Sequence, residues 1–135
     1  MALDLTYLKS FFSGFISAVI IYQSVIVAAT AFKSLERKQS SIFLRTIFPR
    51  FFKLIFVLGA LTFVLCLISR TSIYEYLVSL TTIVLSILCV SIIPLTNRYK
   101  DNNNEKMFGY LHTLSVLLTM IILFVNISLI FLIYY

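Results

Sequence analysis

The stretch that decides the fold is Met107–Tyr135, MFGYLHTLSVLLTMIILFVNISLIFLIYY, which contains no Lys, Arg, Asp or Glu. A helix needs about 20 mostly apolar residues to cross the hydrocarbon core of a bilayer, and this stretch exceeds that length. Two further uncharged runs, Phe11–Phe32 and Tyr76–Asn97, are also long enough. A fourth, Leu54–Ser69, is shorter and is sufficient if the basic residues at its ends extend toward the headgroups. We therefore predict four transmembrane helices, near 8–32, 51–69, 74–95 and 110–134.

The composition agrees with this fold class. The chain is 61% hydrophobic and 12% charged, with a mean hydropathy of +1.04, whereas a soluble domain is about half apolar and a quarter charged. The connections between the predicted spans are too short to form a separate soluble domain. The sequence thus predicts a single all-α unit over residues 1–135, an integral membrane four-helix bundle.

The basic residues are distributed unevenly between the two ends of this bundle. Most of the 11 Lys and Arg residues lie in the segment 33–53 or in the segment 98–106, and the opposite end has only Lys9 and Arg70. Basic residues stay preferentially on the cytoplasmic side, so we expect both termini on the non-cytoplasmic side of a cell membrane, most simply the bacterial inner membrane. The net charge of +6 then needs no nucleic-acid partner. The long apolar run before Ala29-Thr30-Ala31 disfavours a cleaved signal peptide.

The segment Lys33–Lys53 is predicted to lie at the membrane surface. Its apolar and basic residues alternate at roughly helical spacing, which suggests a short interfacial amphipathic turn. Pro49 suits the first turn of a helix, so the second helix is expected to begin beside it. Arg45, Arg50 and Lys53 are the expected contacts of anionic lipid headgroups.

A polar stripe follows the last predicted helix. His112, Ser115, Thr119 and Asn126 fall within about 60° of one another at the helical period. One interpretation is helix packing, with hydroxyls bonding to carbonyls of neighbouring helices. The other is a narrow polar crevice with His112, the single histidine, at its mouth.

Several kinds of chemistry are disfavoured by what the predicted spans lack. The acidic residues fall at span ends or in loops: Asp4, Glu36, Glu75, Asp101 and Glu105. Proton-coupled and cation transporters usually need a carboxylate inside the membrane, and a hydrolase triad needs an acid beside its histidine. One histidine makes a haem or metal site within one subunit unfavourable. Cys66 and Cys89 have no zinc spacing and are expected to pack as small apolar side chains. We therefore predict no cofactor, no metal and no catalytic residue.

Two motifs resemble the transmembrane protein 205-like family, a family of unknown function. They are FLRTIFPRFFKL (Phe43–Leu54), with an aromatic-Pro pair at Phe48 and Pro49, and FGYLHTLSVLLTM (Phe108–Met120), with an F-x-x-L-H-x-x-S pattern on Phe108, Leu111, His112 and Ser115. The chain departs from the family in lacking a late proline in its first helix and in having Thr119 at an expected Asn position. The resemblance implies a four-span membrane protein without an established activity.

Two hypotheses for function follow. The first is a non-enzymatic interaction or accessory subunit, with a second copy or another membrane protein as its partner. The second is a small permease or metal-handling protein that uses the polar stripe. A cavity that reaches Thr119 from the basic end would favour the second hypothesis, and a close-packed interface would favour the first.

Overall fold

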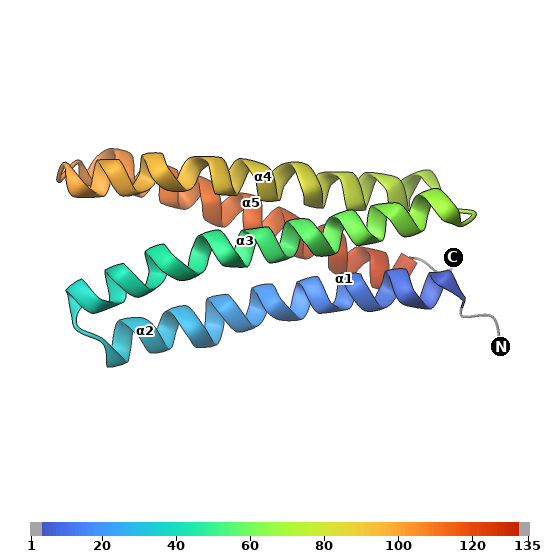
Figure 1. Ribbon diagram of the computed structural model, residues 1–135, viewed down its shortest axis with the longest axis horizontal. Coiled ribbons are helices and arrows are strands. Elements are labelled where there is room, and N and C mark those ends of the chain that lie inside the picture. Colours follow the sequence, from blue (N-terminus) through green and yellow to red (C-terminus); the bar gives the residue numbers. More distant parts are fainter. Residues whose placement is uncertain (1–3, 133–135) are drawn as a thin grey trace.

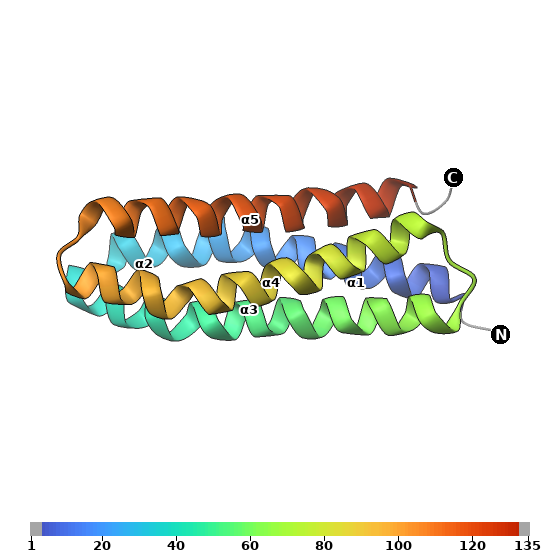
Figure 2. The ribbon, with the colours of Figure 1, turned by 90° about the horizontal axis from the view of Figure 1, so that it is seen from above.

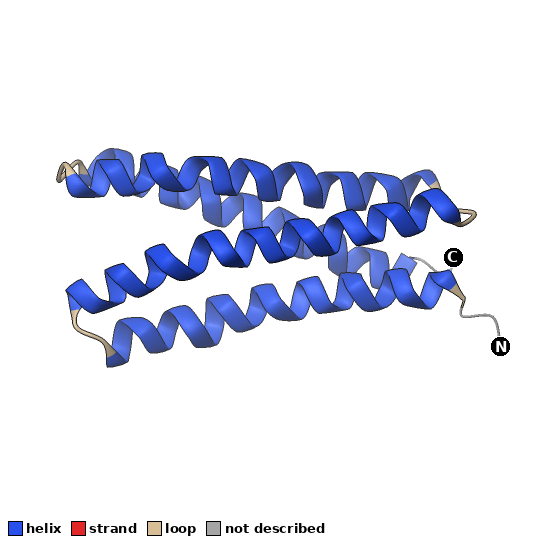
Figure 3. Cartoon of the chain, in the orientation of Figure 1, coloured by secondary structure: helices blue, strands red, loops and turns tan. Residues whose placement is uncertain are grey.

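The computed structural model is all-α and describes residues 4–132 (Figures 1 and 3). Its elements are α1 (Leu5–Ile21), the π-helix η1 (Tyr22–Val27), α2 (Ala28–Ser34), α3 (Arg37–Ile68), α4 (Ile73–Asp101) and α5 (Glu105–Leu132). The first three run on as one helix, Leu5–Ser34, so the described residues form four helices that are long and apolar enough to cross a membrane. The all-α prediction with four apolar helices is thus confirmed, while the predicted end of the last span at residue 134 lies outside the described residues.

Polar side chains set the helix ends. The Asp4 carboxylate accepts a hydrogen bond from the Thr6 amide at 2.9 Å and caps α1. Ser72 and Glu75 form a capping box at the start of α4, which satisfies two otherwise free amides. In the turn after α4, Asn103 has a φ of 55°, a left-handed conformation that asparagine tolerates better than most residues. The Asn-rich segment therefore forms the turn that its composition predicts.

The start of α3 differs from the prediction. We expected the helix to begin beside Pro49, but it begins at Arg37, where Glu36 and Gln39 form a capping box, and Pro49 lies inside the helix. Proline removes one backbone hydrogen bond and weakens a helix, yet membrane helices tolerate it where neighbouring groups satisfy the freed carbonyl. The expected interfacial turn is accordingly part of one long helix.

The helices pack as an antiparallel bundle that is closed at one end and open at the other. Within the described chain, α3 packs on α4, α4 packs on α5, and α1 packs on both α3 and α5. In contrast, α2 contacts only η1 and α3. Figure 1 shows α2 lying well apart from the start of α5, and Figure 2 shows α5 and α3 on opposite sides of the bundle. The apolar core consists of Ile16, Ile20, Phe51, Phe52, Ile55, Leu58, Cys89 and Ile122.

A small contact joins α3, α4 and α5 near the middle of the bundle. Asn126 is buried and donates its amide to the Thr82 hydroxyl at 2.9 Å and to the Ile122 carbonyl at 2.8 Å. On the other side of Thr82 lies Gly59, where a Cβ atom would come within 2.9 Å of the Thr82 methyl group. Glycine at this point lets α3 and α4 approach closely, as small residues commonly do in membrane bundles.

Most buried hydroxyls bond within their own helix and not across helices. Ser17, Thr62 and Thr82 each donate to the carbonyl of the preceding helical turn, at 2.9 Å. The expectation that hydroxyls bond to neighbouring helices therefore holds for few residues. Besides Asn126 with Thr82, the Tyr74 and Ser128 hydroxyls bond across α4 and α5.

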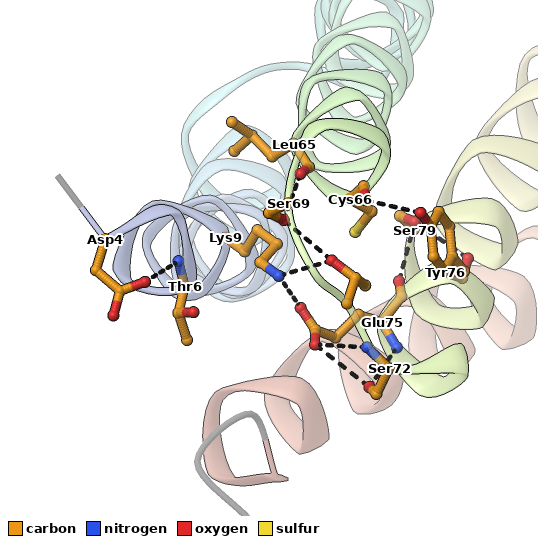
Figure 4. Close-up of polar contacts among 11 residues, drawn as sticks. Asp4, Thr6, Lys9, Leu65, Cys66, Ser69, Ser72, Glu75, Tyr76 and Ser79 are labelled. Carbon is orange, nitrogen blue, oxygen red and sulfur yellow. Dashed lines mark hydrogen bonds and ion pairs between the residues drawn. The ribbon is translucent and has the colours of Figure 1, made fainter. Parts of the chain in front are cut away.

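The closed end holds a buried ion pair (Figure 4). Lys9 of α1 pairs with Glu75 of α4, and the two side chains are 1% and 9% exposed. The Lys9 ammonium also donates to the Thr71 hydroxyl at 3.1 Å, and the second Glu75 oxygen accepts from the Ser72 amide at 3.2 Å. Glu75 was predicted to lie at a span end; it does lie in the first turn of α4, but it is buried there and the Lys9 side chain reaches it from α1.

Enlarging Gly59 is expected to destabilise the bundle. Gly59→Ala places a methyl group against Thr82 and should lower the free energy of unfolding by about 1–3 kcal/mol, the usual cost of overpacking. Unfolding of the purified protein in mixed detergent micelles measures this. Gly109→Ala is the matched control because no atom lies within 4 Å of its added Cβ; it should be neutral or slightly stabilising. Equal effects of the two substitutions would contradict the packing argument.

Breaking the ion pair is expected to cost more than removing both charges. Lys9→Met leaves the Glu75 carboxylate buried without its partner, a change that costs about 3–5 kcal/mol. Lys9→Met combined with Glu75→Gln keeps the helix cap and removes the charge, so it should recover more than half of that loss in the same unfolding assay. Arg70→Met, at an exposed basic residue of the same end, is the control. A double variant as unstable as Lys9→Met alone would refute a buried pair.

Candidate functional site

A cavity of about 670 Å³ lies at the open end of the bundle. Because α2 does not contact α5 among the described residues, a space remains between them. Residues of η1, α2, α3, α4 and α5 line it. The volume falls within the range of roughly 300–1,000 Å³ that is typical of ligand pockets.

One face of α3 forms a wall of this cavity. Its lining side chains recur at the spacing that one helical face requires: Arg37, Ser40, Ser41, Leu44, Arg45, Phe48, Phe51 and Phe52. The charged members lie nearer the start of α3, which is the mouth, and the aromatic members lie deeper. The wall therefore changes from basic to apolar with depth.

The opposite wall comes from α4 and α5, and α4 shows the same gradient. Lys100 lies at the mouth, Asn97 and Thr96 follow along α4, and Ile93 is deepest. On α5 the lining residues are Phe108, His112, Ser115, Val116, Thr119 and Met120, so the hydroxyls of Ser115 and Thr119 lie deeper than the Phe108 ring. A ligand in this cavity would meet basic groups at the mouth, and apolar side chains with a few hydroxyls further in.

Gln23 in η1 lines the cavity with an unsatisfied amide. The side chain is 5% exposed, and its Nε2 atom is buried without a hydrogen-bond partner among the described residues. The helix between Gln23 and the turn that joins α2 to α3 is about as long as the helix between that turn and Phe48. Gln23 and Phe48 therefore lie at a similar depth. A buried polar group without a partner costs about 1–3 kcal/mol. π-Helical turns occur frequently at functional sites.

The cavity lining carries positive charge. Arg37, Arg45 and Lys100 line it, and the described lining residues include no Asp or Glu. Arg45 is bonded through both terminal nitrogens to Asp101, at 3.1 and 2.5 Å, while its Nε atom is buried without a partner in residues 4–132. The Lys100 ammonium lies 4.6 Å from the centroid of the Phe108 ring, a cation–π contact. Lys100 and Arg37 are thus the basic lining residues that form no ion pair within the described chain.

The structure brings together three of the four residues of the predicted stripe. His112, Ser115 and Thr119 line the cavity, with the His112 ring stacked on Phe108 at 5.9 Å between centroids. Asn126 does not reach the cavity, because it is about two turns further along α5 and its amide bonds to Thr82.

The remaining predicted positions divide between the cavity and the outer surface. Phe48 and Phe108 of the family motifs line the cavity, whereas Leu111 is buried and Pro49 is half-buried. Arg45, expected at the lipid headgroups, pairs with Asp101. Arg50 and Lys53 are exposed on α3, and their headgroup contacts stay a prediction.

Sequence reasoning missed Gln23, Arg37 and Lys100. Gln23 lies in a π-helical turn, which a wheel drawn at about 3.6 residues per turn does not describe. Arg37 and Lys100 were counted only as surface charges. As for metals, no group of three or more His, Cys, Asp or Glu side chains within residues 4–132 could hold an ion.

Comparisons with known proteins give a family but no activity. No curated protein and no solved structure matches the chain. Residues 11–93 match the family described as "Domain of unknown function (DUF4149)". The match extends from α1 through most of α4, so it includes Gln23 and the α3 wall of the cavity but not α5. Since more than half of its length matches, the chain belongs to the DUF4149 family.

Proposed function

We propose that this multi-pass membrane protein is a non-enzymatic binding protein, which receives a small amphipathic molecule in the cavity at its basic end. The observation that carries the proposal is the cavity at the basic end, together with its lining residue Gln23, whose Nε2 atom is buried without a partner within the described chain. A buried polar group without a partner costs free energy, so an occupant of the cavity that accepts a hydrogen bond would be a natural partner.

The second hypothesis for function, a small permease, is close to this proposal, and the cavity at Thr119 supports it. Binding is the first step of transport, so the proposed site would serve either a carrier or a binding protein. Metal handling has less support, because the His112 ring stacks on Phe108 and no acidic or cysteine ligand lines the cavity among the described residues.

An accessory role in a larger membrane complex is the second candidate. The cavity-lining residues His112 and Val116 stay exposed on α5, and a partner's helix could cover them. We also propose, on its motifs, that the chain is related to the transmembrane protein 205-like family.

The basic end is proposed to face the cytoplasm, with both termini outside and with the bacterial inner membrane as the host. The distribution of Lys and Arg supports this orientation, because most of them lie in the segments 33–53 and 98–106 and the other end has only Lys9 and Arg70.

Filling the cavity is expected to abolish ligand binding. Val116 lines the cavity and is 44% exposed, while the adjacent Leu117 is 56% exposed and does not line it. Val116→Trp should reduce binding at least tenfold, and Leu117→Trp should leave it unchanged. Native mass spectrometry of the purified chain measures this with two added probes, 1-oleoyl lysophosphatidate and the uncharged 1-oleoylglycerol.

The proposal requires that at least one probe binds the wild-type chain in a way that Val116→Trp prevents. Binding of neither probe, or equal loss in both tryptophan variants, would overturn it. A protein that co-purifies and is released by Val116→Trp would favour the accessory role instead.

The proposed orientation predicts which turns are accessible from outside the cell. Both native cysteines are buried, so an introduced cysteine reports on its own position. Ile73→Cys should react with a membrane-impermeant maleimide on intact cells, and Asn103→Cys should react only after permeabilisation, because both residues are exposed but lie at opposite ends. The reverse labelling pattern would refute the orientation.

A further inference from the structure

We infer that the cavity selects an acyl amphiphile with an anionic headgroup, which Arg37 and Lys100 bind at the mouth while Gln23 donates to a neutral acceptor deeper in the cavity. The inference rests on the proposed function and names the chemical class of its ligand.

The first argument comes from the unsatisfied atoms. Two buried polar atoms of the cavity walls have no partner in residues 4–132, Nε2 of Gln23 and Nε of Arg45. Both are N–H donors. An occupant that reached these two atoms would therefore have to present oxygen atoms with free lone pairs.

The second argument comes from charge. Arg37, Arg45 and Lys100 line the cavity, no described lining residue is acidic, and only Arg45 has a carboxylate partner. A cleft lined by one sign of charge concentrates ions of the opposite sign. A cationic ligand is disfavoured by the same groups, and an anion at the mouth would lie between Arg37 on α3 and Lys100 on α4.

The third argument comes from depth. Gln23 lies at the level of Phe48, whereas Arg45 precedes Phe48 on α3 and is nearer the turn between α2 and α3. At about 1.5 Å per helical residue, this difference places Gln23 roughly 5 Å deeper than Arg45. An oxygen atom that satisfies Gln23 is thus separate from the anionic group and closer to the apolar part, which is where the ester carbonyl of an acyl lipid would lie.

The fourth argument comes from the floor of the cavity. Apolar side chains line its deep part: Phe51, Phe52, Ile93 and Met120. At the same level, the exposed α3 residues Arg50 and Lys53 suit the headgroup boundary. An acyl chain could therefore enter the apolar part directly from the adjacent leaflet. Free phosphate would leave that surface without contacts.

Matched ligands and matched variants test this inference on the full chain. 1-Oleoyl lysophosphatidate should bind at least tenfold more tightly than 1-oleoylglycerol, which has the same chain and ester but no charge. Arg37→Gln and Lys100→Gln should each weaken binding of the phosphate ligand about tenfold and leave the neutral ligand unaffected. Lys38→Gln and Arg98→Gln are the controls, because these basic residues lie near the mouth without lining the cavity.

Gln23→Met tests the deeper contact. It should weaken both ligands, since both have the ester carbonyl, and it should raise the melting temperature of the ligand-free protein because it removes an unsatisfied buried amide. This rise distinguishes lost recognition from misfolding. An unchanged affinity for both ligands would refute the role of Gln23.

The source of the anion is tested by competition. Unlabelled 1-oleoyl lysophosphatidate should displace its labelled form, and inorganic phosphate at the same concentration should not. Equal affinity for the charged and neutral lipids, equal loss in the control variants, or displacement by inorganic phosphate would overturn the inference. If the charged and neutral lipids bound equally, the cavity would still bind amphiphiles and the proposed function would survive. Binding of neither lipid would refute both the proposed function and this inference.

Discussion

Hydrogen bonding without water is the constraint on which the structure depends. In a bilayer each buried polar group must find a partner inside the protein, and the backbone does so by forming four long helices. Buried hydroxyls such as Thr62 bond to carbonyls of their own helix, and Asn126 bonds to Thr82. The described exceptions include the Ser10 and Ser13 hydroxyls in α1 and, among the residues that line the cavity, Gln23 Nε2 and Arg45 Nε.

The two ends of the bundle meet this constraint differently. At one end, Lys9 and Glu75 satisfy each other and Thr71 and Ser72 complete their contacts, so a side-chain ion pair links α1 to α4. At the other end, Arg45 and Asp101 join α3 to α4, while α2 and α5 stay apart within the described chain. The cavity lies at this basic end, which suits binding from one leaflet.

The sequence predicts the class of fold better than the site. Runs without charge are sufficient to identify four apolar helices, because bilayer thickness sets their length. The helical period also places His112, Ser115 and Thr119 on one face, and all three line the cavity. It could not place Gln23, which lies in a π-helical turn, nor the start of α3, where an unusual Glu cap precedes a tolerated proline. The burial of Glu75 depends on Lys9, which is distant in the sequence, and no local pattern records such a contact.

The stability cost of the open end is itself an argument for binding. A cavity forfeits packing contacts, and an unsatisfied buried amide costs free energy as well, and both occur together at the basic end of the bundle. Conflicts of this kind between local rules and the fold are typical of functional sites. Leucine or methionine at position 23 would remove the unsatisfied amide without needing a ligand. Glutamine there contributes favourably only when an acceptor enters the cavity, and the basic residues at the mouth determine which acceptors can do so.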